Sequence, residues 1–195
     1  MARPDTLAQF HPATRPEWRQ WLLENHESSP GVWLVYYKKE TGQPRVSYDD
    51  SVEEALCFGW IDSLPRRLDA ERTALMFTPR KPKSGWSKVN KERLVGLEQA
   101  GLLEPAGLAA IARARQNGAW ESLDAAEAGA VPADLAAALA AEPRAEQHFT
   151  AFSLSSRKMI LTWVLAAKRP ETRARRVAET VRLAALNKRA NVDRE

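Results

Sequence analysis

Strand-forming sequence is confined to one part of this chain, and this limits the folds that the chain can adopt. The run VWLVYYKK, residues 32–39, is rich in β-branched and aromatic side chains and is bounded by turn residues. Two further runs, WIDSLPRRLD (60–69) and RTALMFTPR (72–80), are typical of short strands joined by a turn. Because proline cannot donate to a strand ladder, Pro65 predicts an edge position or a bulge in the first of these two.

Helical patterns occupy the rest of the sequence. Thr14 is a suitable N-cap for a helix that ends at Asn25, and residues 49–51 offer caps for a helix that ends at Phe58, before Gly59. Further helices are predicted after Ser87, over 104–118 and 132–141, and after Ser155 and Pro170. The pattern predicts an α+β fold, in which a small antiparallel sheet with flanking helices is followed by a C-terminal helical module.

The length and the alanine-rich stretch 123–143 suggest two parts. A chain of 195 residues can bury a substantial core without a metal or disulfide staple. We expect an α+β domain over residues 1–125, which carries the motifs CFGWID and PRKPKSGWSKVN, and a helical module over 126–195 packed on it.

Cysteine and histidine are scarce. The single cysteine, Cys57, rules out an internal disulfide and a zinc site of several cysteines, and three scattered histidines offer little for a metal cluster. We therefore expect no metal and no cofactor. The N-terminus has no apolar stretch of the length that a secretory signal needs, and eighteen apolar residues never run together. The expectation is a cytoplasmic protein without a membrane span.

Positive charge gathers at the C-terminal end. The net charge is +4 overall, but residues 155–195 carry +7 and residues 1–154 carry −3. A basic end of this kind can meet nucleic acid, an anionic membrane surface or an acidic protein partner. The alternative is a solvated helix with internal ion pairs, for which Glu179 is suitably spaced from Arg175 and Arg182.

Residues 60–93 combine basic and aromatic side chains. Guanidinium groups bind phosphates or carboxylates in bidentate fashion, and an adjacent aromatic ring can stack on a ligand. Within PRKPKSGWSKVN (79–90), Ser84, Ser87 and the free amides of a helix start add an anion-binding arrangement. The alternative is a capped helix with solvated lysines, because cap residues alone explain both serines.

Cys57 and Asp62 are two further candidates for chemistry. Cys57 falls near a predicted helix C-terminus, where the helix dipole disfavours a thiolate, so a buried core cysteine is the better interpretation. Asp62 is followed closely by Arg66 and Arg67, which suggests a carboxylate held by arginine. A role for Asp62 as a general base is the minority interpretation, because no second acid or nucleophile stands at a recognisable spacing.

Three motifs carry a resemblance to a known family. EEALCFGWIDS, FTPRKPKSGWSKVN and AKRPETRARR, in this order, resemble the bacterial YdeI/OmpD-associated family of bacteriocin-protection proteins, over roughly Trp18 to Leu186. The resemblance implies an association with tolerance of antimicrobial peptides and with an outer-membrane porin, but it transfers no reaction and no catalytic residue. It also implies an N-terminal α+β domain and a C-terminal helical module. The matching positions are Glu54, Cys57, Gly59, Trp60, Ile61, Asp62, Pro79, Arg80, Ser84, Trp86, Ser87 and Asn90.

These observations predict a cytosolic stress or antimicrobial-peptide-protection protein that binds a small anionic or polar ligand or a peptide, or a protein partner. One alternative is an enzyme acting on a small metabolite or modified nucleotide, with Asp62 as acid or base; a weaker one is nucleic-acid binding through the C-terminal helices. The catalytic residues stay unassigned. The predicted ligand-binding residues are Trp60, Asp62, Arg66, Arg80, Ser84, Trp86, Ser87 and Asn90.

Overall fold

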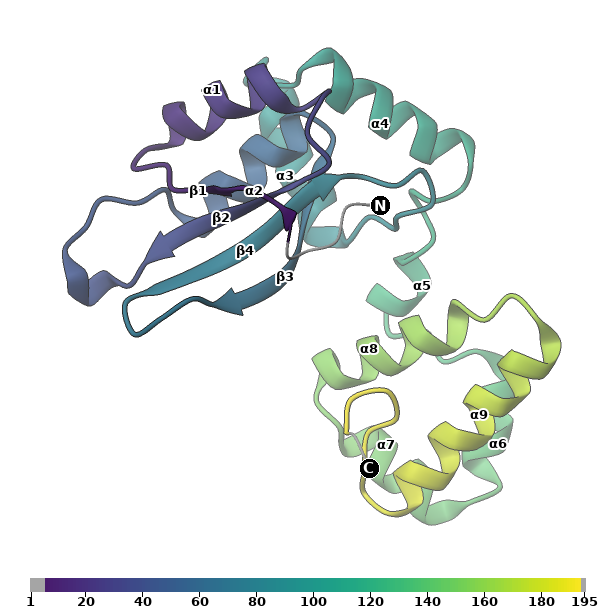
Figure 1. Ribbon diagram of the computed structural model, residues 1–195. Helices are drawn as coiled ribbons and strands as arrows, with labels where there is room; N and C mark the ends of the chain where they lie inside the picture. The colour runs from purple at the N-terminus through teal and green to yellow at the C-terminus, as the bar shows by residue number, and fades with distance from the viewer. Residues whose placement is uncertain (1–5, 194–195) are drawn as a thin grey trace. The chain divides into compact units, whose positions relative to one another are not determined.

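The first part of the molecule contains a mixed sheet, as the computed structural model in Figure 1 shows. The structure describes residues 6–193, and the chain divides after Trp120 into two compact units. Within the described residues, the sheet has four strands in the order β1-β2-β4-β3. The strands are β1 (Gln9–Phe10), β2 (Val32–Tyr37), β3 (Trp60–Arg67) and β4 (Arg72–Pro79).

The α+β class is confirmed, with one change to the sheet. Strands β2, β4 and β3 pair antiparallel, as expected, but the two-residue β1 joins the edge parallel to β2. The ladder between β3 and β4 shifts register between Asp62 and Pro65. A proline without a donor N–H explains why the irregularity falls at this point of an edge strand.

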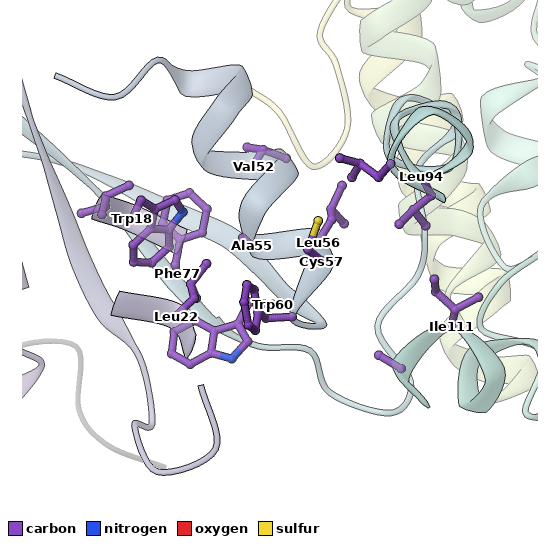
Figure 2. Close-up of a cluster of buried hydrophobic side chains, with 14 of the residues drawn as sticks. Trp18, Leu22, Val52, Ala55, Leu56, Cys57, Trp60, Phe77, Leu94 and Ile111 are labelled. Carbon is purple, nitrogen blue, oxygen red and sulfur yellow. The ribbon is translucent and has the colours of Figure 1, made fainter. Parts of the chain in front are cut away.

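The two faces of the sheet are buried to different extents. Val32 and Leu34 of β2 and Phe77 of β4 lie in the main core of the unit, where side chains of the helices cover them. Figure 2 shows this cluster around Trp18, Leu56 and Trp60. The other face holds a smaller apolar group of Trp33, Val35 and Ala74, packed by Leu7, Leu68 and Met76. Both faces of β2 are therefore buried.

Four helices of the first unit follow the local signals in the sequence. Thr14 caps α1 by accepting from the Glu17 amide, and Ser87 caps α3 by accepting from the Asn90 amide. For α2 the cap is Ser47, earlier than the predicted 49–51. The helices are α1 (Arg15–Asn25), α2 (Tyr48–Cys57), α3 (Lys88–Gln99) and α4 (Pro105–Gln116), with a short 3-10 helix at Lys39–Thr41.

Helices α2 and α4 approach each other closely at two glycines. Gly59 has φ of +71°, and an added Cβ there would lie 3.0 Å from the Ala106 carbonyl oxygen. Gly107 sits against the end of α2, where an added Cβ would lie 2.2 Å from the Cys57 carbonyl oxygen. Only glycine fits this approach, so the turn into β3 and the start of α4 are fixed together.

The second unit is helical. Its core is built from Leu135, Phe149, Ile160, Leu161 and Val164. Helix α8 is capped by Ser153, which accepts from the Ser156 amide, rather than by the predicted Ser155. The helices are α5 (Asp124–Glu127), α6 (Ala133–Ala140), α7 (Pro143–Ala151), α8 (Leu154–Leu165) and α9 (Pro170–Ala185).

Candidate functional site

Arg80 is the centre of the candidate site and directly follows β4. Its backbone amide donates to the Gly59 carbonyl at 2.9 Å, which extends the pairing of β4 with the start of β3. The loop that follows folds back and places the Trp86 ring 3.6 Å from the guanidinium carbon. A stacked guanidinium of this kind has its plane fixed by the ring.

The Arg80 guanidinium is buried but only partly satisfied. The residue is 6% exposed, and Nη1 donates to the Gly85 carbonyl at 3.1 Å. Nε and Nη2 are buried and have no hydrogen-bond partner. These two nitrogens form one edge of the guanidinium, the edge that binds a carboxylate or phosphate in bidentate fashion. A buried charge without a partner lowers the stability of the fold, so an unpaired edge of this kind is unusual in a native protein.

The electrostatics of Arg80 agree with this geometry. Burial lowers the pKa of the Arg80 guanidinium to about 10, and the negative charge of Asp62 opposes that shift. Asp62 is partly exposed and accepts a hydrogen bond from the Tyr48 hydroxyl at 3.2 Å. Arg80 and Asp62 are therefore close enough for their charges to interact. The Nε and Nη2 atoms of Arg80 nevertheless form no hydrogen bond.

Two residues that sequence reasoning missed border this region. Burial, followed by the charge of Asp62, raises the pKa of Tyr48, so its hydroxyl stays protonated and can donate. The Arg93 guanidinium lies 5.9 Å from the centre of the Tyr48 ring, donates to Asn90 Oδ1 at 3.3 Å and pairs with Asp49. Arg93 belongs to the basic and aromatic stretch 60–93 but was not among the predicted ligand-binding residues, and packing of α2 and α3 brings Tyr48 to it.

The structure thus links four of the predicted site residues. The charge of Asp62 acts on Arg80, Arg80 stacks on Trp86, and Asn90 joins the group through Arg93. We refer to Asp62, Arg80, Trp86, Asn90, Tyr48 and Arg93 as the Arg80 site.

The two predicted serines have local roles in the structure. Ser87 caps α3, and the Ser84 amide donates to the Lys81 carbonyl at 2.9 Å in the loop. These contacts shape the segment that carries Trp86.

Trp60 lies inside the main core. It is 1% exposed, and its indole N–H donates to the His26 carbonyl at 3.2 Å. Its ring also meets Trp21 edge-on at 5.8 Å between centroids. Figure 2 shows it among the side chains of this apolar cluster. A satisfied, enclosed indole supports the fold beneath the Arg80 site.

Arg66 lies on the other face of the sheet. It pairs across the ladder with Ala74, whereas Asp62 pairs with Phe77; successive residues of β4 point to opposite faces, so these two positions, three apart, lie on different faces. The Arg66 guanidinium lies 5.5 Å from the centre of the Trp33 ring. The bulge between Asp62 and Pro65 produces this placement, which sequence spacing did not reveal.

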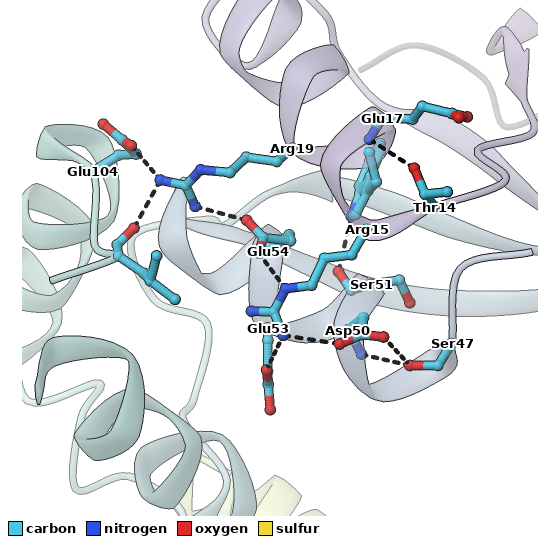
Figure 3. A network of polar contacts seen from close by, with 12 residues as sticks. Thr14, Arg15, Glu17, Arg19, Ser47, Asp50, Ser51, Glu53, Glu54 and Glu104 are labelled. Carbon is cyan, nitrogen blue, oxygen red and sulfur yellow. Dashed lines mark hydrogen bonds and ion pairs between the residues drawn. The ribbon is translucent and has the colours of Figure 1, made fainter. Parts of the chain in front are cut away.

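A second charged cluster holds α2 to α1. Figure 3 shows Glu54, which is 2% exposed, between Arg15 Nε at 2.6 Å and Arg19 Nη1 at 2.7 Å. Arg15 also pairs with Asp50 and Glu53, and Arg19 with Glu104. Although burial opposes the shift, Glu54 raises the pKa of both guanidinium groups. Every member of this Glu54 network has a charged partner, as in a structural contact.

Cys57 is fully buried beside that network. Burial raises the pKa of the Cys57 thiol to about 11, and the charge of Glu54 adds to the shift. A neutral, enclosed thiol matches the core interpretation. Over residues 6–193 the structure places no group of three or more His, Cys, Asp or Glu side chains so that they could hold a metal ion.

The C-terminal basic side chains make contacts within the second unit. Arg173 pairs with Asp134 at 2.7 Å, and Lys158 pairs with Glu127 at 2.8 Å. Arg182 pairs with Glu179, one of the spacings expected from the sequence. Asp134 and Glu127 lie outside residues 155–195, so these pairs offset only part of the +7 excess of that end. In the described part of the chain, no helix is both long and apolar enough to cross a bilayer.

Two family models match this sequence. Residues 10–110, just over half of the chain, match a domain of unknown function, DUF8412. Residues 129–187 match the domain described as "Bacteriocin-protection, YdeI or OmpD-Associated". A search of curated proteins and a search of solved structures each found no match. The resemblance to the YdeI/OmpD-associated family is thus confirmed for residues 129–187, while the first two motifs lie in the range of the other model.

Proposed function

Because the chain belongs to the DUF8412 family and carries a YdeI/OmpD-associated bacteriocin-protection domain at residues 129–187, we propose that it is a cytosolic protection protein whose first unit binds a small anionic ligand at the Arg80 site. The ligand is a phosphate or a carboxylate, the groups that fit a guanidinium edge. Tolerance of antimicrobial peptides would then depend on the ligand-bound state of the protein.

One observation carries this proposal: the buried and unpartnered Nε and Nη2 of Arg80, a residue that is only 6% exposed. Natural proteins satisfy nearly all their buried polar groups, and exceptions concentrate where a ligand or a catalytic step needs them. Both nitrogens are shielded from solvent, so a ligand would reach them only when surrounding side chains move. The negative charge of Asp62 would oppose anion binding there, so the bidentate contact with Arg80 must offset that repulsion.

Thermal shift measurements with inorganic phosphate, sulfate, acetate and nucleotides provide the test, since a ligand that binds only the folded state raises the melting temperature. The decisive variant is Arg80→Lys, which keeps the charge but loses the bidentate edge. The matched control is Arg66→Lys, another arginine stacked on a tryptophan but on the other face of the sheet.

We expect the wild type and Arg66→Lys to bind one of these anions alike, and Arg80→Lys to bind it at least about tenfold more weakly. Equal affinity in the three proteins would refute a site at Arg80, as would the absence of any anion-dependent shift. The protective role is tested separately, by comparing survival of cells that produce the wild type or Arg80→Lys when they are exposed to a cationic antimicrobial peptide.

An enzymatic role has one observation in its favour. Asp62 is partly exposed, lies near Arg80 and accepts a hydrogen bond from Tyr48, so a carboxylate and a phenol could share a proton beside a bound anion. If a bound ligand is converted, Asp62→Asn should lower kcat by at least about 100-fold. Turnover at the wild-type rate in that variant would remove Asp62 from the chemistry.

A further inference from the structure

A groove between α3 and α4 lies in the first unit, apart from the residues assigned to the Arg80 site. Its cavity measures about 270 Å³. Leu94 and Ile111 form part of its wall and are almost fully buried, at 4% and 7% exposed. Val95 and Leu108 also line the groove and are about half exposed, at 56% and 48%. The groove therefore offers an apolar channel whose rim is open to solvent.

Trp120 lines the same groove and carries two cations. The Arg115 guanidinium carbon lies 5.0 Å from the ring centre, and the Lys91 ammonium lies 5.2 Å from it. Both cations also line the groove, and of the described acidic residues only Glu98 does so. Among the residues that the structure describes, Arg115 forms no ion pair. The lining thus has a net positive charge next to an apolar channel.

The Trp120 ring is held in place. Its backbone amide donates to the Ala114 carbonyl at 3.1 Å, and its ring lies 5.2 Å from that of Trp86. Trp86 in turn stacks on Arg80. An aromatic surface fixed in this way loses little conformational entropy when a ligand packs against it.

An ordinary gap between two surface helices would account for the apolar wall alone. It would not account for two cations placed over one ring beside half-exposed leucine and valine side chains, since exposed apolar groups are normally scattered singly. The combination of an apolar channel with positive charge complements a molecule that has an apolar body and a single anionic group.

We propose that the groove binds a small amphipathic anion, with the apolar chain between α3 and α4 and the anionic group beside Arg115 and Lys91. A straight-chain carboxylate represents this class. The site differs from the Arg80 site in its residues and in its ligand, because the anions proposed for Arg80 need no apolar body.

Calorimetric titration of the full chain with hexanoate, octanoate and decanoate tests this inference, with octanol and octylammonium as matched ligands of the same length. Ala112 lines the groove and is exposed, so Ala112→Phe should fill it and abolish binding without disturbing the core. Arg115→Gln should weaken octanoate binding by about fivefold, the size expected of one partly screened charge contact, and leave octanol unchanged. Arg113→Gln is the control, since Arg113 is exposed on α4 and does not line the groove.

Saturable octanoate binding that exceeds octylammonium binding, is lost in Ala112→Phe and persists in Arg113→Gln would support the site. Arg80→Lys should bind octanoate like the wild type, which separates this result from the fate of the Arg80 proposal. Three results would each overturn the inference: no saturable binding, equal affinity for octanol and octanoate, or unchanged octanoate binding by Ala112→Phe.

Discussion

Glu54 and Arg80 are both charged, both in the first unit and both almost fully buried, yet their surroundings differ. Glu54 lies between two guanidinium groups that pair with further carboxylates. Arg80 has one hydrogen bond to a carbonyl and leaves two nitrogens without partners. A fully paired buried charge is typical of a structural contact, whereas an unpaired one lowers stability and persists when function requires it. By this criterion the contact region of α1, α2 and α4, which we call the seam, is structural, whereas the region after β4 that holds Arg80 is a candidate functional site.

The seam is broken most directly at Gly107. An alanine there places Cβ 2.2 Å from a backbone oxygen of α2, so the helices must separate, and we expect a loss of about 4 kcal/mol, above the usual range for overpacking. Gly96→Ala on α3 is the control, because nothing lies within 4 Å and alanine should add up to about 1 kcal/mol through helix propensity. Urea unfolding of both variants measures the contrast. Equal free energies of unfolding for the two variants would show that α2 and α4 can move apart at Gly107 without loss of stability.

The paired charge itself is tested by Glu54→Gln. Removing the carboxylate leaves Arg15 and Arg19 without their shared partner, and breaking a buried pair in this way should cost about 3 kcal/mol. Glu53→Gln is the matched control on the same helix, since Glu53 makes only one of the contacts of Arg15 and is more exposed. Chemical denaturation compares the two. If Glu54→Gln lowered the free energy of unfolding no more than Glu53→Gln does, the ion pairs of Glu54 would be no stronger than ordinary surface pairs.

Cys57 reports on whether the seam stays closed. With its pKa raised to about 11, the folded protein should react with iodoacetamide at pH 8 about 100-fold more slowly than a free cysteine, and unfolding in urea should restore the free rate. The raised pKa of Cys57 also sets how the free energy of unfolding depends on pH. Because folding keeps the thiol neutral, its contribution to stability is complete below about pH 8.5 and is lost as the pH rises toward 11. Rapid alkylation of the folded protein would contradict a closed seam.

Local signals predicted most elements of the first unit. Thr14, Gly59 and Ser87 mark helix ends by their own chemistry, so these boundaries were predictable from the sequence. The two-residue β1 and, in the second unit, helices α5 and α7 were not predicted; a strand that short has no pattern, and Pro143 at the start of α7 was a helix-start signal that went unused.

The candidate site was less predictable than the fold. Arg80, Trp86 and Asp62 stood out through residue type and spacing, but the bulge that turns Arg66 to the other face depends on pairing with β4. The missed Glu54 network did leave a signal: Arg15 and Arg19 share a face of α1 at i,i+4, and the acidic residues 49–54 offer partners. Which buried charge would remain unpaired could not be inferred, because that depends on how the loop after β4 folds back.

Arg80→Met tests the other side of this comparison, and we expect it to raise the free energy of unfolding slightly rather than lower it. Methionine keeps an apolar stem on Trp86 and removes a charge that burial disfavours, while the lost hydrogen bond to Gly85 costs about 1 kcal/mol. Because an apolar replacement of a poorly compensated buried charge is often stabilising, the free energy of unfolding should rise by about 1 kcal/mol in the absence of ligand. Arg66→Met, which removes the exposed stacked arginine on the other face, should change stability little. An anion that stabilises the wild type should no longer stabilise Arg80→Met. A loss of several kcal/mol would instead make Arg80 a structural residue like Glu54, with its free edge satisfied inside the fold.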